Sequence, residues 1–216
     1  HAVVRIVSST GAEVKAVQLV SALPEKSEMW HGVGVAKNGF GVRFADAAGR
    51  AVVRLFDNAG TPGSTNIDLA TLAGSPVMVA GGRGDSVGFH GNGNNAYAAV
   101  ARGLNPDTGS QEVWVTVLNA DGSLRWAKSV ADDVELVSST NLRCDVGIDA
   151  AGRVAVVFND SVVTGGNASL ILGRLFDATG APLGGTFYVS EKELPDPNTL
   201  ASTGPRVAFR GDFIAV

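Results

Sequence analysis

Three histidines are the side chains best suited to metal binding or acid–base chemistry: His1, His31 and His90. Met29 and Trp30 precede His31, and a thioether beside imidazoles is a ligand set that copper accepts. The repeat described below sets His31 and His90 five positions apart, which is roughly 16 Å along a strand at about 3.3 Å per residue. We therefore predict no shared metal site and no cofactor, and keep the three histidines only as individual candidates for a metal ion.

Carboxylates recur in short turns that contain glycine. The aspartates are Asp46, Asp57, Asp121, Asp149 and Asp177. Calcium takes about six to eight oxygen ligands, usually with several carboxylates in one loop, and each of these turns offers one. An aspartate also opens a turn by accepting hydrogen bonds from its own backbone, and glycine supplies the positive φ that closes the turn. We predict turn formation rather than calcium binding.

Catalytic nucleophiles are not indicated. Gly84-Asp85-Ser86-Val87-Gly88 has the Gly-x-Ser-x-Gly spacing, but no helical pattern follows the serine, as a nucleophile elbow requires. The single cysteine, Cys144, begins an apolar run where we expect it to be buried. Spacing singles out no carboxylate pair for glycoside cleavage, although residues distant in sequence can meet in a pocket. The candidate ligand-binding residues are Trp30, His31, Trp126 and Tyr188, because aromatic rings in loops can stack on sugars or peptides.

The elements that must position these residues are repeated β-hairpins. One series covers residues 33–44, 87–100, 146–158 and 207–216, and its anchoring valines are 54, 59 and 61 residues apart. A second series covers residues 3–11, 52–60, 113–122 and 171–180, each followed by another short strand. Val, Ile and Phe fit pleated strands, and Asp or Asn with Gly fits the turns. Two hairpins per period make a four-stranded antiparallel unit that must pack on its neighbours.

Units of this length with four strands predict the blades of a β-propeller. Small residues at Gly34, Gly88, Gly147 and Ala208 suit first strands that crowd around a central axis. Only Leu69–Ala73 has the apolar spacing of a helix. We predict an all-β protein with one propeller domain over residues 1–216 and about four blades. The blade segments are 1–23 with 204–216, 31–70, 85–131 and 143–191.

The chain begins with the last two strands of one unit and stops after the first two strands of another. Pairing Phe213–Val216 with Ala2–Val7 would close a ring of four blades and cover two strand edges. Two alternatives stay open. The chain is a piece of a longer ring, or the last hairpin of one chain completes the first hairpin of another.

The hairpins resemble a bacterial extracellular propeller repeat. In that repeat an arginine-x-phenylalanine-aspartate-x-x-glycine hairpin is followed by a valine-alanine…phenylalanine-valine-valine hairpin. The best match runs over residues 173–185 together with Pro205–Val216. The copy at 113–122 departs from the motif, and Ser8 replaces the aspartate at 3–11. The resemblance implies a part of a large secreted or surface protein used in adhesion and binding, and it transfers no catalytic residue.

Composition excludes several classes of protein. With 216 residues, a net charge of −4 and one cysteine, the chain is no disulfide-built miniprotein. Lysines and arginines are scattered singly, which argues against nucleic-acid partners. No apolar run approaches about 18 residues, so we predict no membrane insertion. The low Cys and Lys content and the Gly/Asn-rich loops favour an exported protein, secreted or at the cell surface. The absence of an initial Met fits either a removed export signal or an excised or tagged piece of a longer protein.

Three functions follow as hypotheses. The first is a non-catalytic extracellular binding or structural module with a carbohydrate or protein ligand. The second is a propeller-type hydrolase or lyase that acts on polysaccharide at the channel mouth. The third is a subunit of an extracellular filament or surface layer, a homo-oligomer joined through sheet edges.

Overall fold

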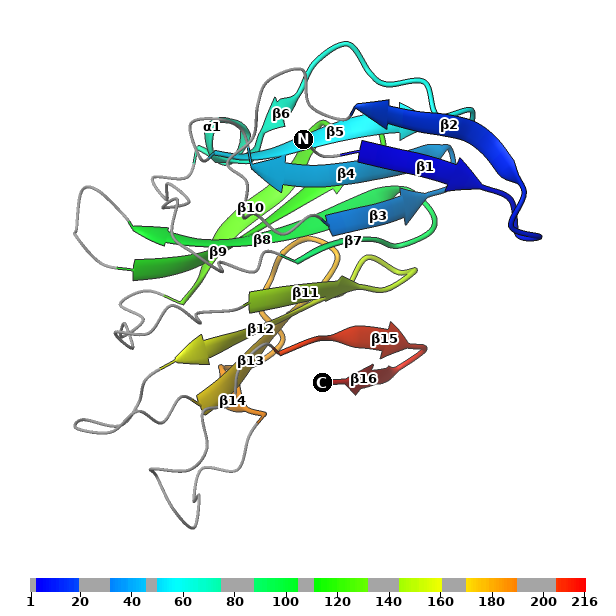
Figure 1. Cartoon of the computed structure of the whole chain (residues 1–216). Helices are drawn as coiled ribbons and strands as arrows, with labels where there is room; N and C mark the ends of the chain where they lie inside the picture. Colours follow the sequence, from blue (N-terminus) through cyan, green and yellow to red (C-terminus); the bar gives the residue numbers. More distant parts are fainter. Residues whose placement is uncertain are drawn as a thin grey trace, which may run out of the picture.

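The computed structural model describes residues 3–19, 32–45, 50–74, 88–104, 111–131, 144–160, 170–189 and 205–216. Within these ranges the chain forms three four-stranded antiparallel sheets and two two-stranded hairpins, arranged as a fan (Figure 1). One short helix, α1 (Leu69–Ala73), lies where the apolar spacing predicts it. The prediction of an all-β protein built from four-stranded antiparallel units is confirmed.

Each sheet uses four consecutive strands. Sheet I comprises β3 (Gly32–Ala36), β4 (Gly39–Ala45), β5 (Ala51–Asp57) and β6 (Ile67–Asp68). Sheet II comprises β7 (Phe89–Gly91), β8 (Ala96–Leu104), β9 (Gln111–Asn119) and β10 (Leu124–Ala131). Sheet III comprises β11 (Cys144–Ile148), β12 (Val154–Asp160), β13 (Leu170–Phe176) and β14 (Phe187–Tyr188). The N-terminal hairpin is β1 (Val3–Val7) with β2 (Glu13–Leu19), and the C-terminal hairpin is β15 (Ala208–Arg210) with β16 (Phe213–Ala215).

The sheets stack through their first strands. Strand β3 contacts β7, β7 contacts β11, and β11 contacts β15. A Cβ atom on Gly34 would lie 2.7 Å from the backbone nitrogen of Gly91, and one on Gly88 would lie 2.5 Å from that of Val146. Both distances are shorter than van der Waals contact, so only glycine permits this approach. The prediction of a small residue in a crowded first strand is confirmed at Gly34, whereas Gly88 lies just before β7, and His90 occupies the equivalent position in sheet II.

Apolar residues fill the spaces between the sheets. Because successive side chains of a strand point to opposite faces, sheet II has a buried side toward each neighbour. Ala98 and Val100 of β8 pack with Val146 of β11 toward sheet III, whereas Tyr97 and Ala99 of β8 pack with Val53 of β5 toward sheet I. The core therefore consists of a series of interfaces between sheets rather than one central cluster.

Cross-strand pairing fixes the register of the repeats. His90 pairs with Ala98, just as Gly34 pairs with Gly41 and Gly147 with Ala155. His90 therefore occupies the position of Gly34, and the repeat alignment that set it five positions from His31 is wrong by two residues at His90. The error arises because a period-two apolar pattern is unchanged by a shift of two residues. The offset predicted between His90 and His31, which lies outside the described residues, changes with it.

The two terminal hairpins dock at different ends of the fan. Lys15 Nζ donates to the carbonyl of Gly60 at 3.1 Å, which ties the N-terminal hairpin to sheet I. The backbone N–H of Val207 donates to the buried Asp145 carboxylate at 3.0 Å, which ties the C-terminal hairpin to sheet III. Figure 1 shows the first hairpin (blue) at the upper end and the second (red) at the lower end.

The predicted pairing of Phe213–Val216 with Ala2–Val7 is not formed. Among the described residues β1 pairs with β2 alone and β16 with β15 alone. The described part of the chain thus contains three four-stranded sheets and two separate two-stranded hairpins, without a closed ring. Each hairpin is held by the sheet beside it.

A matched pair of phenylalanine substitutions tests the stacked core. Phe89 is buried between sheets I and II, whereas Phe213 is 80% exposed on β16. We expect Phe89→Ala to lower the free energy of unfolding by about 3–5 kcal/mol, because it leaves a cavity between two sheets. Phe213→Ala should change it by less than about 0.5 kcal/mol. Urea denaturation followed by circular dichroism measures both, and equal losses would contradict the stacking.

Candidate functional site

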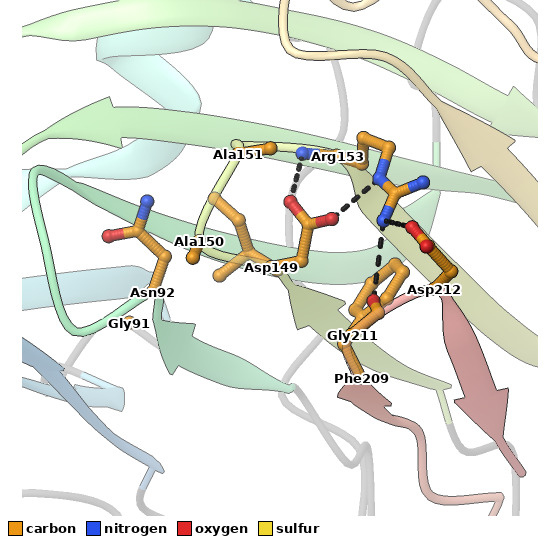
Figure 2. Close-up of a pocket in the computed structure, with 10 residues that line it drawn as sticks. Gly91, Asn92, Asp149, Ala150, Ala151, Arg153, Phe209, Gly211 and Asp212 are labelled. Carbon is orange, nitrogen blue, oxygen red and sulfur yellow. Dashed lines mark hydrogen bonds and ion pairs between the residues drawn. The ribbon is translucent and has the colours of Figure 1, made fainter.

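Three turns converge at one end of the fan and line a pocket. They join β7 to β8, β11 to β12 and β15 to β16, and the pocket has a volume of about 450 Å³. Figure 2 shows the residues that line it, with the charged groups on one side. The lining residues are Gly91, Asn92, Ile148, Asp149, Ala150, Ala151, Arg153, Phe209, Gly211 and Asp212.

A guanidinium group bridges two carboxylates in this pocket. Asp149 is buried, and one of its oxygens accepts the backbone N–H of Arg153 at 2.7 Å while the other accepts from Arg153 Nε. Arg153 Nη2 donates to Asp212 Oδ1 at 2.9 Å and to the carbonyl of Gly211 at 3.3 Å (Figure 2). Hydrogen bonds to Asp149 and Asp212 raise the pKa of Arg153, which therefore stays charged. The bridge fixes the β11–β12 turn against the β15–β16 turn.

The rest of the wall combines an aromatic ring with a rigid polar turn. Phe209 packs against Gly147 of sheet III, where a Cβ atom would lie 3.2 Å from the ring. Asn92 Oδ1 accepts the backbone N–H groups of Asn94, Asn95 and Ala96 at 2.9–3.1 Å, which holds the β7–β8 turn in one shape. The side chain of Asp212 is 89% exposed, so its carboxylate is accessible to a molecule in the pocket.

The residues predicted to bind a ligand are not brought together. Trp30 and His31 lie outside the described residues, as does His1. Trp126 of β10 is buried: its indole N–H donates to the Ala178 carbonyl at 3.2 Å, and its ring packs on that of Phe176, 5.7 Å away. This position between sheets II and III leaves it no open face for stacking.

Tyr188 lies at the edge of sheet III opposite the first strand, β11. It belongs to β14, the last strand of the sheet, and its side chain is 45% exposed. Sheet III lines the pocket at its opposite edge, through residues of the β11–β12 turn. Tyr188 and Trp126 therefore belong to the outer strands of two different sheets, and neither lines the pocket.

His90 faces a carboxylate but belongs to no metal cluster. Its Nε2 atom lies 3.6 Å from Oδ1 of the buried Asp145. No group of three or more His, Cys, Asp or Glu side chains that could hold a metal ion occurs in the described ranges. Cys144 is 1% exposed, so its predicted burial is confirmed.

The aspartate turns form as predicted. Asp57 Oδ1 accepts the N–H of Thr61 at 2.7 Å, and Asp177 Oδ1 accepts those of Thr179 and Ala181 at 2.8 Å. Each turn closes with a glycine of positive φ, Gly60 at 74° and Gly180 at 83°. Asp46 lies outside the described residues. These carboxylates are occupied by their own turns, which accounts for them without calcium.

Sequence reasoning found Asp149 as a turn former and missed its part in the pocket. Arg153, Phe209 and Asp212 were not singled out. A usable signal exists: charged residues gather in the turns between the first two strands of the last two repeats, whereas Lys37-Asn38 and Asn92–Asn95 fill the equivalent turns earlier in the chain. All these turns lie at one end of the strands.

Comparison of the sequence with protein-family models and with curated proteins finds no match. In the described part of the chain, α1 has five residues and no helix is long and apolar enough to cross a membrane. The geometry of the pocket and of the sheets therefore carries the functional argument.

The turn aspartates predict an acid-sensitive component of stability. Hydrogen bonds from Thr179 and Ala181 lower the pKa of Asp177, and similar bonds lower that of Asp57 with Thr61 and of Asp121 with Ser123. A lowered native pKa stabilises the fold above the ordinary aspartate pKa, and this contribution disappears as the pH falls through the native value.

The triple variant Asp57→Asn, Asp121→Asn and Asp177→Asn removes this dependence, because an amide oxygen still accepts the bonds but does not titrate. We expect the melting temperature of the wild type to fall more steeply than that of the variant between about pH 6 and pH 3. Thermal melts across this range measure the difference. If the melting temperatures of both proteins fell in parallel with pH, protonation of the turn aspartates would make no contribution to the loss of stability.

Proposed function

We propose that this chain is a non-catalytic extracellular binding module on a β-propeller-type scaffold. The scaffold is supported by three similar four-stranded sheets that stack through their first strands and by two terminal hairpins that dock at the two ends of this stack. The resemblance of residues 173–185 to a bacterial extracellular propeller repeat supports the same assignment. Export is supported by the composition, with one cysteine in 216 residues and Gly/Asn-rich loops.

The observation that carries the binding function is the pocket at the converging turns. Propeller-type sheets bring the turns between their first two strands to one end, so residues from distant repeats meet there. The pocket offers the Phe209 ring, the exposed Asp212 carboxylate and the Arg153 guanidinium within one wall. An aromatic ring covers the apolar face of a sugar, and a carboxylate beside a guanidinium suits neighbouring hydroxyl groups. A neutral carbohydrate is the ligand that this chemistry fits best.

The arrangement favours binding over proton transfer. A glycosidase needs one carboxyl group that gives a proton and a second that acts as base or nucleophile. Here Asp149 and Asp212 both accept hydrogen bonds from the charged Arg153 guanidinium. They act as a preformed polar wall with a fixed geometry, which reduces the ordering cost of binding.

Calorimetric titration of cellotriose, mannotriose and chitotriose into the full chain tests the binding function. We expect one of them to bind and Asp212→Ala to weaken it by about tenfold or more, because a charged hydrogen bond to the ligand is lost. Asp212 is exposed at a turn, so its loss leaves the sheets intact.

The matched control is Asp121→Ala, which removes an exposed turn aspartate outside the pocket, between β9 and β10. Its affinity should equal that of the wild type. Equal weakening by both variants, or no binding by any sugar, would refute the assignment. Release of reducing ends from a polysaccharide by the wild type but not by Asp212→Ala would favour the hydrolase or lyase instead.

A further inference from the structure

Within the described residues, the contact between first strands of neighbouring units occurs three times, as β3 with β7, β7 with β11 and β11 with β15, and is not formed on the other face of sheet I. Cross-strand pairing makes Val33, Phe89 and Val146 equivalent, since each sits opposite the second strand at the same level. Val207 takes the same position in the C-terminal hairpin, where its N–H meets Asp145. Phe89, Val146 and Val207 are 0–3% exposed because the preceding sheet covers them, but Val33 is 56% exposed. Among the described residues, the N-terminal hairpin packs on sheet I, but no first and second strands of a preceding unit cover Val33.

The matching surface is exposed on the C-terminal hairpin. In sheet III, Gly147 and Ala155 face the next unit and are covered by Phe209. Their equivalents in the hairpin are Ala208 and Ala215, which pair with each other and are both exposed. The contact between two units joins small residues of one unit to larger apolar residues of the next. Ala208 and Ala215 offer the small surface, and Val33 together with Val35, which is 57% exposed, offers the larger one.

The turns between the third and fourth strands of the sheets lack a neighbour at the N-terminal hairpin as well. A Cβ atom on Gly60, Gly122 or Gly180 would lie 2.2, 2.5 or 2.7 Å from a side chain of the preceding unit, so each turn is tightly packed. Gly11 closes the equivalent turn of the N-terminal hairpin and has nothing within 4 Å of its Cβ position. Among the described residues, no unit packs on this turn of the N-terminal hairpin, and none covers Ala208 and Ala215 of the C-terminal hairpin.

The free strand edges have compatible registers. In sheet III, Val154 pairs with Phe176 and Ala155 with Leu175 across the second and third strands. The repeat makes Ile214 and Ala215 equivalent to Val154 and Ala155, and Val7 and Ile6 equivalent to Phe176 and Leu175. Joining β16 to β1 would therefore place Ile214 opposite Val7 in a sheet of the order β15-β16-β1-β2, like the three complete ones.

We propose that the C-terminal hairpin of a second copy of this chain docks on Val33 and Val35 and pairs its β16 with β1. Within one chain the hairpins are held apart by Lys15 on Gly60 and by Val207 on the buried Asp145, with Arg153 on Asp212 as a further tie. Association between copies keeps all these contacts and adds the missing fourth interface. The contact is head-to-tail, because different surfaces of the two copies meet.

Mixed cysteine cross-linking tests this junction. Paired residues of neighbouring antiparallel strands have Cα atoms about 4.5–5.5 Å apart, within the range that a disulfide spans. One preparation carries Val7→Cys and the other Ile214→Cys, both with Cys144→Ala to remove the native thiol. After mixing under mild oxidation, we expect a cross-linked species that contains one chain of each kind. Closure within a chain cannot produce it, because neither chain holds both cysteines.

The control replaces Val7→Cys by Val14→Cys, which is exposed on β2 of the same hairpin and away from the junction. It should give no cross-link with Ile214→Cys. The proposal is overturned if the mixture gives no mixed species, or no more than this control gives. An internal disulfide in the double variant Val7→Cys with Ile214→Cys would then assign the junction to the chain's own hairpin.

Light scattering supplies an independent measurement. The wild type should elute with a mass of at least two chains of 22.1 kDa. Val33→Lys places a charge in the proposed interface and should weaken association by about tenfold or more. Because Val33 is exposed in the single chain, its substitution should leave the circular dichroism spectrum unchanged. A monomeric wild type over the whole concentration range would overturn the proposal.

Discussion

The close approach of the first strands β3, β7 and β11 is the constraint on which the rest of the structure depends. A side chain at Gly34 or Gly88 would collide with the backbone of the next strand, so these positions carry glycine. The approach brings Phe89 and Val146 over the preceding sheet, where they are buried. The close approach at these two glycines thus allows hydrophobic burial between the sheets.

The turns that close each hairpin and the contacts between neighbouring sheets make separate contributions to the fold. Each hairpin is closed by its own turn, as where Asp177 accepts hydrogen bonds from Thr179 and Ala181. A hairpin alone is marginally stable and exposes both faces. Stability therefore comes from the contact between neighbouring units. Val33 and Gly11 mark two places where, in the described part of the chain, no neighbouring unit packs.

The pocket is a consequence of the same stacking. Because the strands of all the sheets run in register, the turns after β7, β11 and β15 reach the same end. Asp149 and Asp212 are 63 positions apart in the chain, yet Arg153 bonds to both. The Asp145 carboxylate of β11 also joins distant repeats, because it accepts a hydrogen bond from the backbone N–H of Val207.

The sequence by itself determined the strands, the turns and the grouping into four-stranded units, because alternation of apolar residues and Asp/Gly turn chemistry act over a few neighbouring residues. It also indicated the small residues of the first strands. Only the tertiary structure decided the register of His90, the burial of Trp126 between two sheets and the meeting of Arg153 with Asp212. A period-two pattern is blind to shifts of two residues, and contacts between units depend on how the sheets stack, which no local pattern encodes.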